Sequence, residues 1–557
     1  MRGLMQDYPL TLPYVFDRFE RLFGGKKLVW NTVSERKRTT VAEWTDRARR
    51  IGGVLDALGV PADGRVGTFA WNTADHLALY WAAPCTGRIL HTLNIRLFPE
   101  QLTFVVNHAE DDVVFVDKSL LPLFWKLAAS PTGETTNKPG DTFTTVRHVV
   151  VMDDGAPGEL PDDPRIHLLD ELLADAPPVR FAAEDENAAA SMCYTSGTTG
   201  NPKGVVYSHR SIYLHSLGVL NAAAGIGMME RDRVLPVVPM FHANCWGWGH
   251  APLFAGTELV LPGPQMAPAA IATMLEEERV TMTAGVPTIW MGMLPELDGR
   301  DLSALRAILC GGSAVPKALS EAYREKLGQP ILHAWGMTET SPLGSINGTI
   351  SAYDGLGEEE AADVRARQGI PPVGVDARIV EPGTLEELPW DDKATGELQV
   401  RGPWIAADYY RVEHSEESFT ADGWLRTGDV GAIDPYGNIR LSDRTKDLVK
   451  SGGEWISSVE LENHLMAHPA VAEAAVIGVP HPRWQERPLA AVVLKDDQSA
   501  TKEELLEFLA PRVAKWWLPD DVVFIDEVPK TSVGKFSKKD LRTRFADYQL
   551  PDVSTGS

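Results

Sequence analysis

Short apolar runs alternate along the chain with longer segments that repeat apolar residues at helical spacing. Two such helical segments are 41–58 and 268–278. The apolar runs have the length of strands that are buried on both faces; they are 65–70, 112–116, 148–152 and 258–261. Because strands that alternate with helices favour parallel pairing with helices on the faces of the sheet, the chain is expected to be an α/β protein.

The last hundred or so residues have a different pattern. Helices are predicted over 459–467 and 502–511, and strands over 471–479, 489–494 and 521–525. With 557 residues the chain exceeds the roughly 250–300 at which a single core stops growing. We therefore expect a large multi-layer N-terminal α/β domain and a small C-terminal α+β domain. Two stretches, 130–141 with its Thr, Pro and Gly and 355–363 with its acidic run, are expected to be exposed loops.

A run of hydroxyl and glycine residues follows the apolar segment 191–194. It reads Thr-Ser-Gly-Thr-Thr-Gly-Asn-Pro-Lys-Gly over 195–204. A Walker A loop requires Gly-Lys followed directly by Ser or Thr, whereas Lys203 is followed by Gly204, so a P-loop NTPase is excluded. Backbone N–H groups in such a run can approach phosphate oxygens, and Lys203 can balance their charge. Taken alone, the run fits either a phosphate-binding loop or a surface turn.

Further motifs stand downstream in a fixed order. They are the dipeptide at 241–242 and the segments 311–316, 335–340, 423–429, 443–447 and 529–536. Together with 195–204, these motifs resemble the adenylate-forming superfamily of acyl-CoA synthetases, luciferases and adenylation domains. Within it, the segments 450–457 and 1–5 are most similar to bacterial medium- and long-chain fatty acyl-CoA ligases. The resemblance covers nearly the whole chain.

The resemblance implies an AMP-forming carboxylic acid–CoA ligase. ATP would activate the acid as an acyl-adenylate with loss of pyrophosphate, and coenzyme A would then displace AMP. A carboxylate is a poor acyl donor because its leaving group would be oxide, so a better leaving group must first be attached. Attack on the α-phosphorus needs little acid–base chemistry and depends on positioning and on stabilisation of charge.

The resemblance also assigns an ATP site. The phosphate loop would comprise Thr195, Ser196, Gly197, Thr198, Thr199, Gly200 and Lys203. Thr195 and Glu339 would orient Mg²⁺, which prefers hard oxygen ligands. Asp429 would accept hydrogen bonds from the ribose hydroxyls, and Arg444 would add a second ribose or phosphate contact. The other nucleotide-side residues would be Gly312, Ser313, Ala314, His333, Ala334, Trp335, Gly336, Thr338 and Trp455.

One departure from the family pattern concerns the adenine. The family usually has Tyr-Gly where this chain has Trp335-Gly336. Tryptophan can still stack on adenine but lacks the phenolic hydroxyl.

The family mechanism further implies a moving C-terminal domain. Residues 1–443 would form the N-terminal adenylate-forming domain, 444–446 the hinge, and 447–557 a mobile lid. Lys535 would stabilise charge during adenylation. Rotation about the hinge residue Lys446 would replace Lys535 by a second face that carries Lys450, Gly452 and Gly453 beside the CoA channel.

The acid is less well defined than the chemistry. The substrate-binding residues implied by the resemblance are Phe241, His242, Trp246, Val286, Gly311 and Gly336. Amino-acid-activating relatives carry Asp where this chain has His242, which argues against an amino acid. The residues expected to line the acid site are apolar and favour a medium- or long-chain fatty acid. The same residues are equally consistent with an ordinary hydrophobic core. They are Met240, Phe241, Trp246, Trp248, Val286, Trp290 and Met291. Trp246 resembles a gate residue of long-chain relatives. The alternative substrate is a short-chain, thioether or aryl acid.

Composition narrows the remaining function classes. The chain carries 53 basic and 77 acidic residues, for a net charge of −24, which argues against nucleic acid or anionic membrane as a partner held by bulk charge. No apolar run of about 18 residues occurs, and no basic segment precedes an apolar one at the N-terminus, so neither a transmembrane segment nor a signal peptide is predicted and a cytoplasmic location is expected. The resemblance to long-chain ligases implies a homodimer.

The sequence bears on three alternatives to the ligase. Cys85, Cys193, Cys245 and Cys310 lie far apart without a C-x-x-C pair, so they indicate neither zinc nor disulfides, and a nucleophilic role for Cys193 or Cys245 lacks a neighbouring base. A luciferase-like oxidative enzyme would share every motif and would consume oxygen. A catalytically idle binding module would be expected to lose Lys535 or Glu339, and both are present.

Overall fold

The computed structural model describes residues 1, 3–128, 143–195, 201–221, 226–348, 350–381, 384–413, 415–444, 446–452, 454–530 and 536–551. Its helices are α1 (Leu12–Phe23), α2 (Val41–Ala57), α3 (Ala74–Cys85), α4 (Pro99–Ala109), α5 (Leu121–Ala128), α6 (Leu169–Asp175), α7 (His209–Leu220), α8 (Ala243–Trp246), α9 (Ala251–Ala255), α10 (Pro268–Glu277), α11 (Pro287–Met293), α12 (Lys317–Leu327), α13 (Glu358–Ala366), α14 (Ser458–Met466), α15 (Lys502–Leu509) and α16 (Lys538–Arg544).

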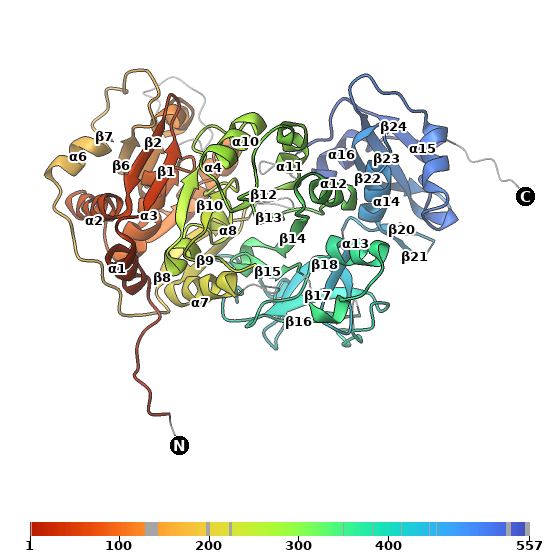
Figure 1. The fold of residues 1–557 in the computed structure, drawn as a ribbon, viewed down its shortest axis with the longest axis horizontal. Helices are drawn as coiled ribbons and strands as arrows, with labels where there is room; N and C mark the ends of the chain where they lie inside the picture. The colour runs from red at the N-terminus through yellow and green to blue at the C-terminus, as the bar shows by residue number, and fades with distance from the viewer. Residues whose placement is uncertain are drawn as a thin grey trace, which may run out of the picture.

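Two predominantly parallel sheets form the large N-terminal domain (Figure 1). The first has the order β7-β6-β5-β3-β4-β8-β9, with β3 (Arg65–Phe69), β4 (Ile89–Thr92), β5 (Asp111–Asp117), β6 (His148–Met152), β7 (Ile166–Leu168), β8 (Ala189–Tyr194) and β9 (Gly204–Ser208). Among the described strands of this sheet, β8 and β9 pair antiparallel and the other neighbours pair parallel. The sheet contains three of the four strands that the apolar runs predict.

The second sheet has the order β15-β14-β13-β12-β10-β11-β1-β2. Its strands are β1 (Lys27–Asn31), β2 (Arg36–Thr40), β10 (Arg233–Pro236), β11 (Glu258–Leu261), β12 (Met282–Gly285), β13 (Ala307–Cys310), β14 (Ile331–Gly336) and β15 (Leu343–Ile346). The strands are parallel from β1 to β14, and antiparallel strands β2 and β15 close the two edges.

Helix α3 joins the two sheets. It contacts β4 and β8 of the first sheet and β1 of the second. Its side chains Tyr80 and Trp81 are fully buried, and the Trp81 indole N–H donates to the Gly249 carbonyl at 3.1 Å. Large aromatic side chains bury much apolar area each, so α3 supplies a core that holds the sheets in fixed relation.

Two smaller sheets complete the chain. An antiparallel sheet contains β16 (Asp376–Val380), β17 (Gly396–Arg401), β18 (Leu425–Ile433) and β19 (Ile439–Arg444). The small C-terminal domain contains β20 (Val449–Ser451), β21 (Glu454–Ile456), β22 (Val471–His481), β23 (Gln485–Leu494) and β24 (Asp521–Phe524), with α14, α15 and α16 packed on them. The predicted α/β fold with a small α+β domain is thus confirmed.

The acidic stretch at 355–363 is the clear error of the sequence-based prediction. Most of its residues are exposed as expected, but α13 begins within it at Glu358 and buries Ala362. Gly357 precedes the helix, and Glu358, Glu359 and Glu360 occupy its first turn, where carboxylates interact favourably with the free backbone N–H groups. The other predicted loop, 130–141, lies outside the described residues.

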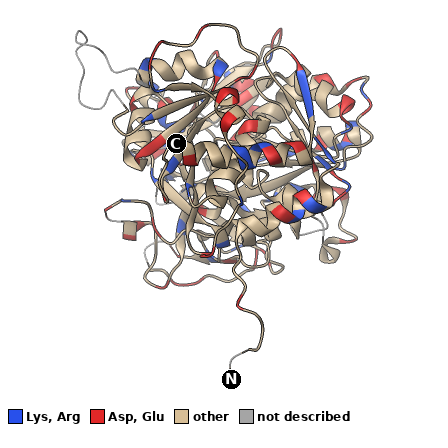
Figure 2. Cartoon of the chain, turned by 90° about the vertical axis from the view of Figure 1, so that its left-hand side faces the viewer, with Lys and Arg blue, Asp and Glu red and all other residues tan. Residues whose placement is uncertain are grey.

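In Figure 2, acidic and basic residues alternate along the chain, and both kinds occur on the same helices. Among the described helices, none is long and apolar enough to cross a membrane.

Candidate active site

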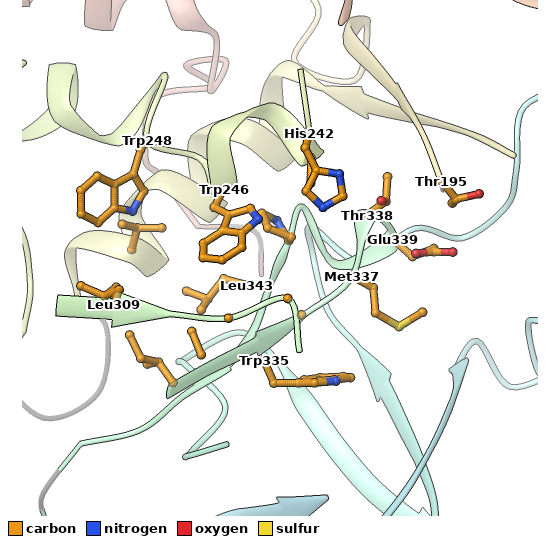
Figure 3. A pocket seen from close by; sticks show the side chains of 18 of the residues that line it. Thr195, His242, Trp246, Trp248, Leu309, Trp335, Met337, Thr338, Glu339 and Leu343 are labelled. Atoms are coloured by element: carbon orange, nitrogen blue, oxygen red, sulfur yellow. The ribbon is translucent and has the colours of Figure 1, made fainter. Parts of the chain in front are cut away.

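A cavity of about 230 Å³ lies where the carboxyl ends of β13 and β14 meet the end of β8. We call it the central cavity. In open α/β sheets, ligands usually bind at the carboxyl ends of the strands. Figure 3 shows its two ends: Thr195 and Glu339 lie together on one side, and Trp248 and Leu309 lie on the other, with His242 and Trp246 between them.

The polar end gathers residues of the sequence motifs. Thr195 and Lys203 flank the phosphate loop and are joined by two hydrogen bonds: the Thr195 N–H donates to the Lys203 carbonyl at 2.9 Å, and the Lys203 N–H donates to the Thr195 hydroxyl at 3.0 Å. These bonds close the loop at its base. Residues Ser196, Gly197, Thr198, Thr199 and Gly200 lie outside the described residues.

Glu339 is held at this end by Tyr409. The Tyr409 hydroxyl donates to the Glu339 carboxylate at 2.6 Å, and the Ala406 N–H donates to the Glu339 carbonyl at 2.7 Å. The Lys203 ammonium lies 4.5 Å from the centre of the Tyr409 ring, a cation–π arrangement. Tyr409 therefore fixes the carboxylate and the ammonium relative to each other.

A second cavity, of about 280 Å³, adjoins the first and is lined by both domains; we call it the junction cavity. Gly312, Trp335, Gly336 and Arg444 line both cavities, and Ala334 does so as well. The junction cavity is also lined by the predicted nucleotide residues Ser313, Ala314, His333 and Asp429 and by the predicted hinge residue Lys446.

Both carboxylate oxygens of Asp429 have partners. One accepts from the Trp335 indole N–H at 2.8 Å, and the other lies 3.2 Å from the Arg444 guanidinium. The charge of Asp429 is the main cause that raises the pKa of Arg444, and burial lowers the pKa of Lys446. The tryptophan that departs from the family pattern thus has its own polar contact, since its N–H orients the ring against the Asp429 carboxylate.

The apolar end extends the central cavity away from Glu339. We call it the apolar arm; its walls come from α7, the α8 turn, β12, β13 and β15, and from the segment before β10. The residues are Val219, Ile226, Met228, Trp246, Trp248, Met282, Leu309, Leu343 and Ile346. Such a lining favours an apolar group and offers few hydrogen-bond partners for a polar one.

The predicted substrate residues divide into two groups. His242, Trp246, Gly311 and Gly336 line the central cavity. Gly336 allows close packing there, because a Cβ atom at this position would lie 1.6 Å from the Pro342 carbonyl oxygen.

The other predicted wall residues lie elsewhere. Phe241 packs into the core formed with β5 and β6, and Val286 precedes α11 and lines neither cavity. Met240 is fully buried, the Trp290 N–H donates to the Leu309 carbonyl at 3.2 Å, and Met291 faces the junction cavity.

The small domain presents two separate sets of residues. Phe536, Ser537 and Lys538 line the junction cavity; Lys535 itself lies outside the described residues, as do Gly453 and Thr445. Lys450, Gly452 and Trp455 lie instead on the β20–β21 hairpin, where the Lys450 ammonium is 4.9 Å from the centre of the Trp455 ring. Neither cavity is lined by this hairpin set.

The four cysteines are buried thiols. Burial raises the pKa of Cys193 to about 11 and raises the pKa of Cys245 further. Since the thiolate is the nucleophile, these shifts argue against the nucleophilic role considered from the sequence.

Two family models match the chain: "AMP-binding enzyme" over residues 18–410 and "AMP-binding enzyme C-terminal domain" over residues 460–535. The chain belongs to the AMP-binding enzyme family. Among its relatives, the long-chain-fatty-acid–CoA ligase of Thermus thermophilus is 45% identical over 98% of this chain and 97% of that protein. The 3-methylmercaptopropionyl-CoA ligase of Ruegeria lacuscaerulensis is 42% identical over 98% of this chain and 99% of that protein.

A solved CoA ligase shares the fold over nearly the full length. The anthranilate CoA ligase AuaEII, in complex with anthranoyl-AMP, superposes with a TM-score of 0.83 at 26% identity and covers 98% of this chain and all of its own. The resemblance stated from the motifs is therefore confirmed at the level of the family.

Proposed function

We propose that this AMP-forming acid–CoA ligase activates a medium- or long-chain fatty acid through an acyl-adenylate and transfers the acyl group to coenzyme A. The apolar arm is the observation that carries the proposal. It continues from the polar end of the central cavity, so a carboxylate beside Glu339 and Lys203 leaves its apolar tail among Met228, Leu309 and the other side chains of the arm. The thioether and aryl acids named for relatives are the alternative, because a short or planar acid would occupy only the near part of the same arm.

The polar end suits the first half-reaction. As the acid oxygen attacks the α-phosphorus, negative charge is redistributed toward the departing pyrophosphate, and a positioned ammonium and a bound cation stabilise it. Lys203 supplies the ammonium. The Asp429 carboxylate accepts from ribose hydroxyls, and Trp335 stacks on the adenine in the junction cavity.

Mg²⁺ fits the oxygen groups at this end. Among the described residues, no cluster of three or more His, Cys, Asp or Glu side chains could hold a metal ion. Mg²⁺ that arrives with ATP needs only one or two protein oxygens, because phosphate and water complete its shell. The Glu339 carboxylate and the Thr195 hydroxyl would hold it, and the ion would neutralise phosphate charge.

The separation of the two residue sets in the small domain supports a two-face scheme. Residues that directly follow Lys535 line the junction cavity, whereas Lys450, Gly452 and Trp455 lie on another part of the domain. Rotation about 444–446 would exchange Lys535 for the hairpin set before CoA attacks. A homodimer and a cytoplasmic location also stay predictions.

Trp335→Phe is expected to raise KM for ATP about tenfold and to leave KM for the acid within about twofold. The change keeps an aromatic face but removes the N–H that bonds the charged Asp429 carboxylate. Initial rates at varied ATP measure the effect. Trp44→Phe is the matched control, since its buried indole N–H bonds the Ala74 carbonyl at 3.0 Å away from both cavities; an equal rise of KM for ATP in both variants would contradict the nucleotide role.

The substrate is tested by kcat/KM for saturated acids from C2 to C18, together with benzoate, cinnamate and 3-methylmercaptopropionate. A maximum between C8 and C16 is expected. Leu309→Phe should move that maximum to shorter acids, because Leu309 lies at the far end of the arm from Glu339 (Figure 3). A maximum at the thioether or aryl acids would keep the chemistry and overturn the proposed substrate.

A further inference from the structure

The short segment between His242 and Gly247 winds in the left-handed sense. The φ angles of Ala243, Asn244, Cys245 and Trp246 are +42°, +49°, +57° and +53°, and Gly247 follows at +78°. Only glycine adopts this region freely; asparagine tolerates it better than most residues, and alanine, cysteine and tryptophan do so poorly. A run of such residues persists only where the surroundings hold it, and such strain is typical of functional sites.

The turn is closed by its own backbone bonds. The Cys245 N–H donates to the His242 carbonyl at 3.0 Å, the Gly247 N–H to the Asn244 carbonyl at 3.0 Å, and the Trp248 N–H to the Cys245 carbonyl at 2.9 Å. These bonds make one tight helical unit. These backbone bonds alone do not determine that the turn is left-handed.

The Asn244 side chain ties the turn to the neighbouring sheet. It is 3% exposed, and its amide N–H donates to the Ser191 hydroxyl at 2.8 Å. Its amide oxygen accepts from the Cys193 thiol at 3.0 Å and from the Thr92 hydroxyl at 3.4 Å. Every partner belongs to β8 or to the end of β4, so the turn is tied to the strand that leads into Thr195.

The turn carries the two side chains that separate the ends of the central cavity. His242 precedes it and Trp246 ends it, and Figure 3 shows both between Thr195 and Leu309. The Trp246 ring also approaches the opposite wall, since a Cβ atom on Gly311 would lie 3.3 Å from it. Because the hand of a turn sets the direction in which its side chains project, a change of hand would move both residues.

We infer that Asn244 is a positioning residue for acid binding: its buried amide holds the left-handed turn against β8 and thereby aligns Trp246 and His242 with the phosphate-loop strand. The inference rests on the proposed function, because it takes the apolar arm as the acid site. Asn244 contacts neither ATP nor the acid in this account, and it acts through the turn.

Two substitutions separate the backbone effect from the side-chain anchor. Asn244→Gly keeps the left-handed conformation accessible but removes the amide, and Asn244→Ala removes the amide and disfavours the conformation. We expect Asn244→Gly to raise KM for dodecanoate about tenfold with KM for ATP changed by less than about twofold, as loss of an anchoring buried hydrogen bond would produce. Asn244→Ala should have the larger effect and lower kcat as well. Ser191→Ala, which removes the acceptor of the Asn244 amide, should raise KM for dodecanoate by a smaller factor.

Asn31→Ala is the matched control. Asn31 is also a buried asparagine, its side-chain oxygen accepts from the Arg36 guanidinium at 3.0 Å, and it lines neither cavity. It should lower the unfolding temperature without raising KM for the acid. Wild-type kinetics in Asn244→Gly and Asn244→Ala, or an equal rise of KM for ATP and acid, would overturn the inference. Failure of the wild-type enzyme to act on any acid would overturn the proposed function instead.

Discussion

Glu339→Gln is expected to slow pyrophosphate release about 100- to 1,000-fold. The substitution keeps the shape of the side chain but removes the negative charge that would hold Mg²⁺ beside the phosphates, and loss of one preorganised charge interaction at a transition state typically has this size. Rapid-quench measurement of pyrophosphate in a single turnover isolates the step. Tenfold more Mg²⁺ should restore part of the rate in the variant.

Tyr409→Phe distinguishes the charge of Glu339 from its placement. It removes the hydroxyl that bonds the carboxylate at 2.6 Å and leaves the charge and the ring beside Lys203. We expect a loss of about tenfold or less. If Tyr409→Phe were as slow as Glu339→Gln, positioning and not the carboxylate charge would dominate.

Lys535→Ala is expected to abolish adenylation, with at least about a 100-fold loss of pyrophosphate release, while transfer from supplied acyl-adenylate to CoA stays within about threefold of wild type. The reason is that the ammonium would stabilise charge in the first half-reaction alone and would leave the site before the second. The two half-reactions are measured separately on the same enzyme preparation. Equal loss in both would contradict the two-face scheme.

Lys530→Ala is the control for Lys535→Ala. Lys530 belongs to the same motif segment, but its ammonium pairs with Glu473 at 2.7 Å on the small domain and lines neither cavity. Both half-reactions should proceed at wild-type rates. A slower half-reaction in Lys530→Ala would indicate that a change on the surface of the small domain, and not loss of the Lys535 charge, explains the effect of Lys535→Ala.

The fold was predictable where the chain is locally consistent. The apolar runs at 148–152 and 258–261 coincide with β6 and β11, because a strand buried on both faces leaves a continuous apolar signature. The acidic stretch at 355–363 misled the prediction, since a run of carboxylates resembles a solvated loop but also suits the first turn of a helix.

The polar end of the site was likewise predictable, whereas Trp246 and Trp248 were the part of the apolar arm that the sequence analysis named as wall residues. Thr195, Lys203 and Glu339 stand in motifs whose residue types fit phosphate chemistry. The walls of the arm include Val219, Met282 and Leu309, which belong to separate elements and are ordinary apolar residues in the sequence. Only tertiary packing brings them together.

Tyr409 and Asn244 were missed for different reasons. Tyr409 lies in an irregular segment without a periodic signal and acts through a contact with Glu339, which is seventy positions away. Asn244 lies two positions after the 241–242 motif, and an asparagine three positions before Gly247 could have suggested a turn. Its left-handed conformation and its buried partners on β8 appear only in the structure.

The most direct test of the account is the stoichiometry of a single reaction mixture that contains the enzyme, ATP, Mg²⁺ and dodecanoate, assayed with and without CoA. With CoA, we expect AMP, pyrophosphate and dodecanoyl-CoA to accumulate continuously in equal amounts. Without CoA, pyrophosphate should stop at about one equivalent per enzyme, because the acyl-adenylate stays bound. Sustained pyrophosphate release without CoA, oxygen uptake, or no release at all would contradict the account.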